Sequence, residues 1–441
     1  MISDIIKETD TQTYLEQLGR SGGMVLGLAS IRDLMAELGN VQNKLKFVHV
    51  AGTNGKGSVC AFLSSILTEA GVCVGTYTSP AVFGRAEQYR VNGEDITEEA
   101  FDETVAKVRR ACERLREKGK NHPTVFEVET AAAFLYFYQR GCEVVILETG
   151  MGGETDATNI IETPLACVLT SISMDHMKFL GDSLDKIARA KAGIIKENSQ
   201  VVAVNPLQPE VRQVLEDRCA KKHASLTYSD ETQAKELRYG TKEQGLRFTY
   251  PGLGEVELSM AGAYQAQNAV CAIETIKVLR NAGFAVSGGQ IRTGLRKARW
   301  EGRFSVLCRH PLLITDGAHN RDAAKKLRET LKRGFTNYKI IYIIGVLADK
   351  EHEEMLKIML PLAWKVYTVT PFGPRAMDGE ALAKEAAKYH AQVRFCPDLK
   401  EAAAFAFDSA RGENAMILAF GSLSYLKELR EILKETPDYD R

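Results

Sequence analysis

The sequence predicts an α/β fold in two domains, each with a mostly parallel sheet flanked by helices. Short apolar segments that suit buried strands alternate with longer helical patterns along almost the whole chain. The 441 residues exceed the size of one typical core, and 45% of them are hydrophobic, as in ordinary globular proteins. The chain shows no internal repeat and no low-complexity segment.

The first domain is predicted to span residues 1–297. Its strands are expected at Phe47–Ala51, Cys73–Tyr77, Val144–Leu147, Leu165–Thr170 and Val201–Val204, with helices at Glu98–Lys118, Val125–Tyr138 and Leu184–Ile195. Near-continuous apolar strands between helices indicate a buried parallel sheet. The segment Leu237–Leu258 differs, because Gly240, Gly245, Gly252 and Gly254 break it into short alternating pieces, and it predicts a small antiparallel patch.

The second domain is predicted to span residues 298–441, and to be smaller and Rossmann-like. Its strands are expected at Leu312–Thr315, Lys339–Ile344, Lys365–Thr370, Gln392–Cys396 and Met416–Phe420. A helical pattern separates each strand from the next, which again favours a parallel sheet.

A glycine-rich turn between a strand and a helix is the most informative motif. It reads Gly52-Thr-Asn-Gly-Lys-Gly-Ser58 and precedes an apolar helix-like run. Backbone N–H groups of such a turn and the helix N-terminus can cradle phosphates, and Lys56 can reach the outer ones. Ser58 can hold a magnesium ion. Although Val50 stands where the longer P-loop pattern has glycine, and an extra glycine precedes Ser58, the turn predicts a P-loop domain that binds a nucleotide.

Polar residues also follow two further strands, where ligands bind in open α/β sheets. Glu148 ends the apolar run Val144–Leu147, and His176 follows the next strand in the segment Ser171–His176. A buried carboxylate needs a partner, so Glu148 taken alone fits a salt-bridged or capping glutamate and a metal ligand equally well. A histidine placed like His176 is by itself typical of a structural role. Beside a phosphate loop, the two together favour a site for magnesium and a nucleotide.

Composition argues against several classes of partner. The 57 basic and 57 acidic residues cancel, which disfavours nucleic acid and anionic membranes and favours a small-molecule partner. No apolar run approaches the ~20 residues of a membrane span, and the N-terminal segment does not resemble a signal peptide. Nine cysteines are scattered singly, so we expect reduced core residues in a cytoplasmic protein rather than disulfides or a zinc site.

A series of motifs then occurs in a characteristic order. They are Gly52–Ser58, Tyr77-Thr-Ser-Pro80, Glu148-Thr-Gly-Met-Gly-Gly153, Asp156-Ala-Thr-Asn159, Asp175-His176, Lys191-Ala-Gly-Ile-Ile-Lys196, Trp300-Glu-Gly-Arg303 and Asp316-Gly-Ala-His-Asn320. Through them the chain, from about residue 20 to Tyr425, resembles the folylpolyglutamate synthase/dihydrofolate synthase family of the Mur ligase superfamily. That resemblance implies an ATP-binding first domain with a folate site, and a second domain that contributes to nucleotide and glutamate binding.

The resemblance also implies an ATP-dependent ligase that adds L-glutamate to the γ-carboxylate of a folyl-(poly)glutamate. ATP would phosphorylate this carboxylate, and the amine of glutamate would displace phosphate from the acyl phosphate. This chemistry makes sense because a carboxylate is a poor electrophile until its oxygen becomes a leaving group, while the protein supplies positioning and charge neutralisation.

Individual roles follow from the resemblance, position by position. Gly55, Lys56, Gly57 and Ser58 match phosphate-binding residues, and Thr53 and Asn54 belong with them to the expected cofactor-binding set. Asn268, Arg303 and Asp316 match nucleotide contacts. His319 and Ser422 match the cleft that receives glutamate, and Ser422 is also counted among the cofactor-binding residues. The magnesium ligands are Ser58, Ser79, Glu148, His176 and a carbamylated Lys191, and Mn²⁺ should substitute for Mg²⁺ because histidine is an uncommon magnesium ligand. The expected catalytic residues are Lys56, Lys191, His176 and His319.

The residue pattern and the resemblance disagree about Lys191. From its pattern alone, this residue is an ordinary lysine on the exposed surface of a helix. The resemblance instead implies that a carbamate on its side chain helps to hold a second magnesium ion.

Three stretches depart from the family pattern. The arginine that follows Glu87 in the family is Gln88 here, with Arg85 and Arg90 as candidates to replace it in holding an α-carboxylate. Gly-His-Gln is replaced by Ala263-Tyr-Gln265, and His-Asn-Pro by His319-Asn-Arg321. Neither of the last two changes removes a residue assigned to chemistry.

Two other readings compete with the folate ligase. A Mur ligase that acts on a UDP-linked cell-wall precursor carries a separate domain before the loop, and the 51 residues that precede Gly52 are too few for it. A GTP-dependent switch would need Asn-Lys-x-Asp, and Asn43-Lys-Leu-Lys46 lacks the aspartate. We therefore expect a monomeric ligase that uses ATP, L-glutamate and either folate or dihydropteroate, since the pterin-facing segment Pro123–Glu127 fits both.

Overall fold

The computed structural model describes residues 10–21, 27–206, 208–239 and 245–435. The chain divides into two compact units, each assembled from separate segments. Unit 1 comprises residues 1–172, 176–230 and 269–294, and unit 2 comprises residues 173–175, 231–268 and 295–441. The predicted domain boundary near residue 298 stays a prediction. It assumes a single boundary, whereas each of the two units consists of three separate segments of the chain.

Unit 1 is built around an eight-stranded sheet of order β4-β3-β2-β5-β1-β6-β7-β8. Six neighbouring strands run parallel, namely β2, β5, β1, β6, β7 and β8. At the β2 edge, β3 and β4 continue the sheet in antiparallel pairing. The strands are β1 (Phe47–Ala51), β2 (Val74–Tyr77), β3 (Tyr89–Val91), β4 (Glu94–Asp95), β5 (Val144–Glu148), β6 (Ala166–Leu169), β7 (Gln200–Val204) and β8 (Ser225–Ser229). The predicted parallel sheet is confirmed, and the bounds of its five predicted strands differ by no more than one residue.

Helices cover both faces of this sheet. They are α2 (Thr11–Ser21), α3 (Ala29–Glu37), α4 (Lys56–Glu69), α5 (Glu98–Glu117), α6 (Val125–Gln139), α7 (Met177–Leu180), α8 (Leu184–Ala192), α9 (Pro209–Lys221), α10 (Gln265–Asn281) and α11 (Gly288–Lys297), with short 3₁₀ turns at Val41–Lys44, Arg85–Gln88 and Ala157–Ile160. The first residues of α10 and the last of α11 belong to unit 2. Helix α8 ends three residues before the predicted Ile195.

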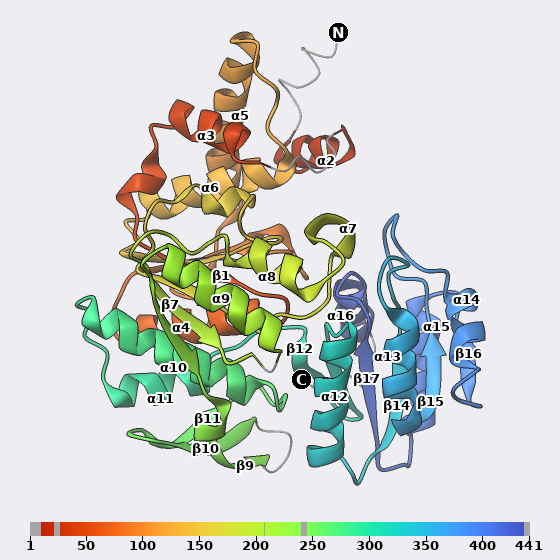
Figure 1. Ribbon diagram of the computed structural model, residues 1–441. Helices are drawn as coiled ribbons and strands as arrows, with labels where there is room; N and C mark the ends of the chain where they lie inside the picture. Colours follow the sequence, from red (N-terminus) through yellow and green to blue (C-terminus); the bar gives the residue numbers. More distant parts are fainter. Residues whose placement is uncertain (1–9, 22–26, 207, 240–244, 436–441) are drawn as a thin grey trace. The chain divides into compact units, whose positions relative to one another are not determined.

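Successive residues of a strand point to opposite faces of the sheet, and their contacts show which helix lies on which face. At Gly75 in β2, an added Cβ would lie 2.8 Å from the Phe137 ring of α6. The next residue, Thr76, points the other way and donates to the Ser64 hydroxyl of α4 at 2.9 Å. Helices α6 and α4 therefore pack on opposite faces of the sheet, as Figure 1 shows.

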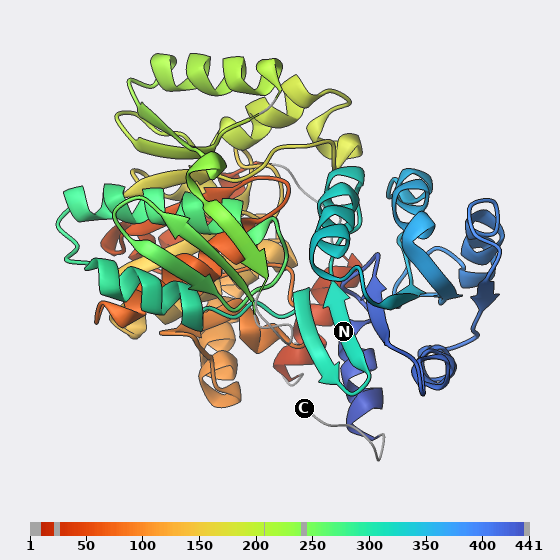
Figure 2. The same cartoon turned by 90° about the horizontal axis from the view of Figure 1, so that it is seen from below.

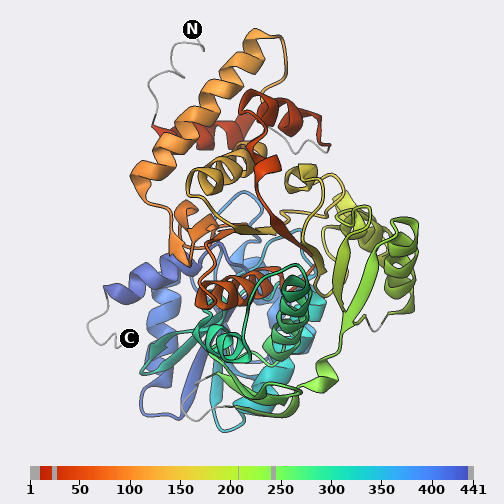
Figure 3. The ribbon, with the colours of Figure 1, turned by 90° about the vertical axis from the view of Figure 1, so that its left-hand side faces the viewer.

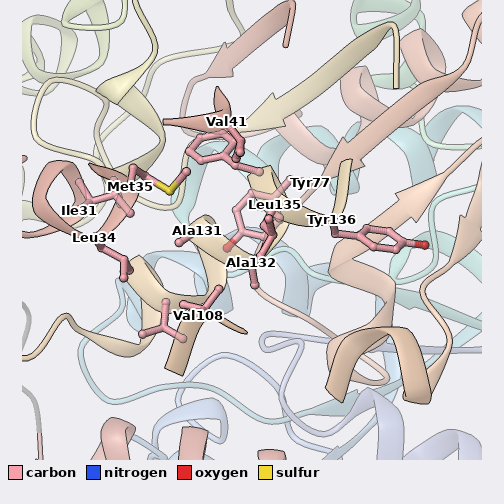
Figure 4. Close-up of a cluster of buried hydrophobic side chains, with 14 of the residues drawn as sticks. Ile31, Leu34, Met35, Val41, Tyr77, Val108, Ala131, Ala132, Leu135 and Tyr136 are labelled. Atoms are coloured by element: carbon pink, nitrogen blue, oxygen red, sulfur yellow. The ribbon is translucent and has the colours of Figure 1, made fainter. Parts of the chain in front are cut away.

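A helical layer completes the core on the α6 side, where α2, α3 and α5 gather (Figure 3). Figure 4 shows side chains of α3, α5 and α6 meeting there, with Ile31, Leu34, Val108, Ala131 and Leu135 among them. Burying each of the larger ones contributes roughly 1.5–3 kcal/mol.

Unit 2 contains two sheets (Figures 1 and 2). The larger has the order β12-β13-β17-β14-β15-β16 and is parallel except for β12, and the smaller is antiparallel with the order β11-β10-β9. The strands are β9 (Lys235–Tyr239), β10 (Leu246–Tyr250), β11 (Gly254–Leu258), β12 (Arg303–Arg309), β13 (Leu312–Asp316), β14 (Lys339–Ile344), β15 (Ala363–Thr368), β16 (Val393–Phe395) and β17 (Ala415–Phe420). The helices are α12 (Arg321–Gly334), α13 (His352–Met359), α14 (Gly379–Ala386), α15 (Leu399–Ala410) and α16 (Leu426–Lys434).

These sheets confirm the second predicted parallel sheet and the antiparallel patch. Strand β15 begins and ends two residues earlier than expected, and Gly240 of the predicted patch lies outside the described residues. All nine cysteines are unpaired, and all but Cys73 are buried, which confirms their predicted place in the core. Among the described helices, none is long and apolar enough to cross a membrane.

A buried histidine lies inside the unit 1 sheet. His49 of β1 is fully buried, and its Nε2 lies 2.9 Å from the Thr158 hydroxyl, which in turn donates to Asp156 Oδ1 at 2.5 Å. Because Thr158 spends its proton on Asp156, Nε2 of His49 must be the donor to Thr158. Nδ1 has no partner, so a proton there would be a buried unsatisfied donor. Burial, with Lys196 nearby, lowers the pKa of His49 to about 3.

This histidine predicts an acid-sensitive fold. The folded pKa of about 3 lies below the ordinary value of 6.5, so the unfolded chain binds a proton that the folded chain does not between these limits. The free energy of unfolding should therefore decrease as the pH is lowered, by up to about 1.4 kcal/mol per pH unit. Denaturant titrations at pH 6 and pH 5 should show a shallower fall for His49→Gln. Carboxylates common to both proteins cancel, so identical slopes would contradict a neutral buried His49.

Helix α11 predicts a second stability effect, because it packs closely against α4 at one glycine. A Cβ at Gly294 would lie 2.5 Å from the Ile66 Cα, while at Gly289 of the same helix the nearest atom, Ser287 Oγ, is 3.8 Å away. We expect Gly294→Ala to cost about 1–3 kcal/mol in unfolding free energy. Gly289→Ala should instead be neutral or gain up to about 1 kcal/mol. Equal denaturation midpoints for the two variants would rule out the close contact.

Candidate active site

The glycine-rich turn is joined to the end of β6 by its own backbone. Gly52 has φ +149°, and a Cβ there would lie 1.8 Å from the Thr170 hydroxyl oxygen, so only glycine fits. Beyond it, the N–H groups of Thr53 and Asn54 donate to the Ser171 carbonyl at 2.8 and 3.4 Å. These two predicted cofactor-binding residues therefore use their backbone donors to hold the turn.

The rest of the turn opens into the N-terminus of α4. Gly55 precedes the helix with φ +95°, and the Val59 N–H makes the first helical bond, to the Gly55 carbonyl at 3.0 Å. The N–H groups of residues 56–58 precede this ladder, where the helix dipole adds partial positive charge. This geometry suits an anion such as a phosphate.

Two lysines converge on one carbonyl of the turn. Lys56 Nζ lies 3.3 Å and Lys191 Nζ 2.8 Å from the Gly52 oxygen. Lys56 also faces Glu148, with Nζ 3.8 Å from Oε1. Glu148 is thus ion-paired in this structure, which is one of the two alternatives that its sequence position left open.

The expectation of an exposed Lys191 is wrong, because only 4% of this residue is exposed. It lies four residues after the buried Ile187 on α8 and so shares the face of the helix that packs inward. The sequence signal that could have indicated burial is that Lys191 shares this helix face with Ala188 and Ala192 as well.

The loop after β5 holds the end of α8 in place. A Cβ at Gly153 would lie 2.8 Å from the Lys191 carbonyl, and one at Gly193 would lie 2.4 Å from the Glu154 Cα. Asn159 Nδ2 bridges the two segments by donating to the carbonyls of Glu154 and Gly193, at 3.1 and 3.2 Å. Close backbone packing at these glycines and the Asn159 side chain therefore fix the end of α8 that carries Lys191.

Oxygen donors suited to a metal ion gather at the same edge of the sheet. Strand register aligns Val50 of β1 with Glu148, and Tyr77 of β2 with Leu147, so Ser79 follows β2 at the end of the sheet where Glu148 lies. Ser79 Oγ is buried and has no hydrogen-bond partner, and Ser58 and Glu148 are only 2% and 4% exposed. An unsatisfied hydroxyl at the same end of the sheet as a buried carboxylate is the kind of donor set that Mg²⁺ accepts.

Histidine is less clearly part of this set. His176 is exposed at the start of α7, with φ +51°. Within the described residues, no group of three or more His, Cys, Asp or Glu side chains is placed to hold a metal ion. A metal there would therefore depend on the hydroxyl donors as well as on Glu148.

Both candidate replacements for the missing arginine are already paired. Arg85 bonds Glu129 of α6, and Arg90 Nε lies 2.6 Å from Asp95. Gln88 is buried and also bonds Glu129, and burial raises the pKa of that carboxyl despite these partners. Arg85 and Gln88 thus anchor the segment that follows Ser79.

In unit 2, polar residues follow the adjacent strands β13, β17 and β14. Asp316 ends β13 in register with Phe420 of β17, and Ser422 follows β17 with its hydroxyl 2.9 Å from that of Ser424. Asp316 accepts hydrogen bonds from Tyr264, Phe304 and Ala318. Burial raises the pKa of Asp316, and its donors and the nearby Arg303 oppose this rise.

His319 belongs to a cluster in unit 2 that the sequence did not indicate. Its Nδ1 lies 2.8 Å from the Gly317 carbonyl, and its Nε2 lies 3.3 Å from Asp175 Oδ2. The other oxygen of Asp175 accepts from Lys350 Nζ at 2.6 Å. Asp175 and Lys350 were missed as partners because 175 positions separate them, and only their places after β-strands hinted at a shared role.

Asn268 completes the predicted nucleotide contacts of unit 2. It is buried near the start of α10, and its Nδ2 donates to Gln265 Oε1 at 2.9 Å. Arg303, at the start of β12, lies beside the Asp316–Gly317 turn, since a Cβ at Gly317 would lie 2.4 Å from Arg303 Nη1. Asn268, Arg303 and Asp316 therefore all occur in unit 2, whereas the phosphate turn, Ser79, Glu148, His176 and Lys191 occur in unit 1.

Family models match both parts of the chain. Residues 50–276 match the Mur ligase middle domain, and residues 302–423 match the Mur ligase glutamate ligase domain. A protein of Bacillus subtilis named dihydrofolate synthase/folylpolyglutamate synthase is 36% identical over 93% of this chain and 96% of its own length. The folylpolyglutamate synthase of Lacticaseibacillus casei is 36% identical over 79% of this chain and 82% of its own length.

Solved structures agree with these relatives. Folylpolyglutamate synthase of Mycobacterium tuberculosis, complexed with ADP and AMPPCP, matches 97% of this chain and 100% of that chain, at 28% identity and a TM-score of 0.88. FolC of E. coli in complex with DHPP and ADP matches 97% of this chain and 98% of that chain, at 29% identity and a TM-score of 0.83. This chain therefore belongs to the dihydrofolate synthase/folylpolyglutamate synthase family of Mur ligases.

Proposed function

We propose that this protein is an ATP-dependent ligase that adds L-glutamate to the γ-carboxylate of a folyl-(poly)glutamate. The observation that carries the proposal is the convergence of the Gly52–Ser58 turn, Lys56 and the buried Glu148 at one edge of the sheet. Family membership supports the same reaction. The alternative substrate, a UDP-linked cell-wall precursor, has less support, because relatives that match most of the chain are named for folate.

Lys56 and the N-terminus of α4 are suited to neutralise phosphate charge. The ammonium group reaches back to the Gly52 carbonyl, so Lys56 lies folded against the same turn whose end forms the N-terminus of α4. The pairing with Glu148 at 3.8 Å is long enough for Lys56 to move onto a phosphate at small cost. Phosphorylation of the substrate carboxylate would then proceed with its developing charge stabilised by fixed donors.

Mg²⁺ fits the oxygen donors of this edge, and Ser58, Ser79 and Glu148 would hold it, with His176 as a further proposed ligand. When bound, Mg²⁺ would neutralise charge on the phosphates of ATP, and Mn²⁺ should replace it. The unsatisfied Ser79 hydroxyl is the observation of this structure that supports the assignment.

Lys191 is proposed to act as a carbamate. Its ammonium group shares the Gly52 carbonyl with that of Lys56, so two like charges meet in a buried place. Burial and a neighbouring cation both disfavour the ammonium form, and only a neutral amine attacks CO₂. The resulting anion would remove the repulsion and offer oxygen atoms to a metal ion.

Unit 2 is proposed to supply further contacts. Asn268, Arg303 and Asp316 would bind the nucleotide, and His319 and Ser422 would receive glutamate. Lys350, held by Asp175, carries a positive charge suited to a carboxylate, and the His319 ring lies against the same aspartate. We further infer that the protein works as a monomer in the cytoplasm, where a reducing environment suits its nine free cysteines.

The decisive test is ADP release by the purified protein with ATP, Mg²⁺ and L-glutamate, with tetrahydrofolate or dihydropteroate as acceptor. Turnover with both acceptors would indicate a bifunctional enzyme. Turnover with neither would overturn the proposed function.

In the same assay we expect Lys56→Ala to lose at least about 100-fold in kcat. The reason is the loss of one electrostatic contact to the transition state, which costs on the order of 3 kcal/mol. Lys221→Ala, at an exposed position of α9, serves as the matched control and should behave as the unsubstituted protein. Near-normal turnover of Lys56→Ala at saturating ATP would refute the phosphate role.

For Lys191 we expect Lys191→Ala to lose most activity and Lys191→Arg not to restore it, since neither can form a carbamate. A short carboxylate added to the alanine variant should return part of the activity by supplying the missing anion. Lys186→Ala is the control, because Lys186 lies exposed on the same helix and pairs with Asp182. Full activity of Lys191→Ala without added anion would exclude a catalytic role.

A further inference from the structure

Tyr264 stands where the family has histidine, and its side chain contacts a proposed nucleotide-binding residue. The Tyr264 hydroxyl donates to Asp316 Oδ2 at 2.5 Å. The next residue, Gln265, accepts from Asn268 Nδ2 at 2.9 Å. Two adjacent residues thus hold two proposed nucleotide contacts that come from different segments of unit 2, the first residues of α10 and the end of β13.

The donors around Asp316 leave one of its oxygens partly open. Oδ2 accepts from the Tyr264 hydroxyl and from the Phe304 N–H at 2.9 Å, and Oδ1 accepts from the Ala318 N–H at 2.8 Å. A carboxylate offers about four acceptor positions, two on each oxygen. Oδ2 is therefore filled, and Oδ1 keeps one position for a further donor.

Tyr264 is itself held in one orientation. A Cβ at Gly262 would lie 2.6 Å from the Tyr264 Cζ, so the ring lies against a backbone without a side chain. The Ala263 N–H donates to the Thr330 hydroxyl of α12 at 2.9 Å and fixes the segment. Burial and the neighbouring carboxylate raise the pKa of the Tyr264 phenol well above its usual value, so the hydroxyl stays a donor.

We propose that Tyr264 is a positioning residue of the nucleotide site, whose hydroxyl orients the Asp316 carboxylate so that Oδ1 is the oxygen left for the nucleotide. This inference rests on the proposed function. Without the hydroxyl, the carboxylate keeps only its two backbone donors and is held less firmly in its orientation. Nucleotide affinity should then fall although no atom assigned to nucleotide contact has been removed.

The test is calorimetric titration of the full chain with MgADP. Tyr264→Phe should raise the dissociation constant roughly tenfold, as expected for a lost hydrogen bond to a charged group. In turnover assays KM for ATP should rise by a similar factor while kcat at saturating ATP changes less. Tyr342→Phe is the matched control, because it removes a buried hydroxyl that donates to the Met359 carbonyl in the same unit, and it should leave MgADP binding unchanged.

A double-mutant cycle shows whether Tyr264 acts through Asp316. In an Asp316→Asn background, Tyr264→Phe should weaken binding far less than in the unsubstituted protein. If Tyr264→Phe folds poorly, Gly262→Ala, which displaces the ring and keeps every polar group, should weaken binding in its place.

The outcomes separate the two proposals. Unchanged MgADP affinity in folded Tyr264→Phe, or equal effects of this substitution in both backgrounds, would overturn the inference alone. Failure of the unsubstituted protein to bind MgADP would overturn it together with the proposed function.

Discussion

The backbone at Gly52 is the constraint on which the proposed phosphate site depends. Its positive φ and the contact with Thr170 leave no room for a side chain, and they turn its carbonyl toward Lys56 and Lys191. A residue with a Cβ would push β1 away from β6 or rotate the carbonyl. Either change would release both lysines at once, because they share a single acceptor. One glycine therefore sets the position of the loop and of the two cations that serve it.

Parallel sheets explain why the polar groups lie where they do. All strands of a parallel sheet end at the same edge, so residues that follow different strands gather there although they are distant in sequence. In unit 1 this edge collects the phosphate turn, Ser79 and Glu148. In unit 2 the same rule collects the Asp316–His319 turn, Ser422 and the segment that leads to Lys350. The hydrophobic strands position these groups and take no part in the chemistry.

The sequence predicted the regular parts of the fold well. Apolar periodicity located the inner strands of both large sheets, because strands buried on both faces leave a strong pattern. It missed β8 at one edge of the unit 1 sheet and the short pair β3 and β4 at the other, whose residues are mostly half-buried or exposed and so carry a weaker signal. It also missed β12, the antiparallel edge of the second sheet. Edge strands need one neighbour only, and their sequences are correspondingly less restricted.

At the site, local motifs were informative and long-range pairs were not. The glycine turn could be predicted because its function needs a fixed spacing of glycine, lysine and hydroxyl within a few residues. The pairing of Arg85 with Glu129, or of Lys350 with Asp175, depends on how separate segments pack, and no local pattern encodes it. Lys191 is an intermediate case. Its helical spacing from Ile187 indicated burial, but lysines are so often exposed that the general tendency outweighed the local pattern.

Buried charges give an independent argument for where function lies. The side chains of Lys350 and Asp175 are only 10% and 8% exposed. The attraction within such a buried ion pair does little more than offset the cost of removing both charges from water. An apolar pair of similar volume would serve folding at least as well, so stability alone does not explain the charges. Their effect is to hold His319 through the second oxygen of Asp175. The same reasoning applies to Lys191 and Glu148 in unit 1. Both units thus keep costly charged groups at the edges of their sheets, which are the places where the proposed function needs them.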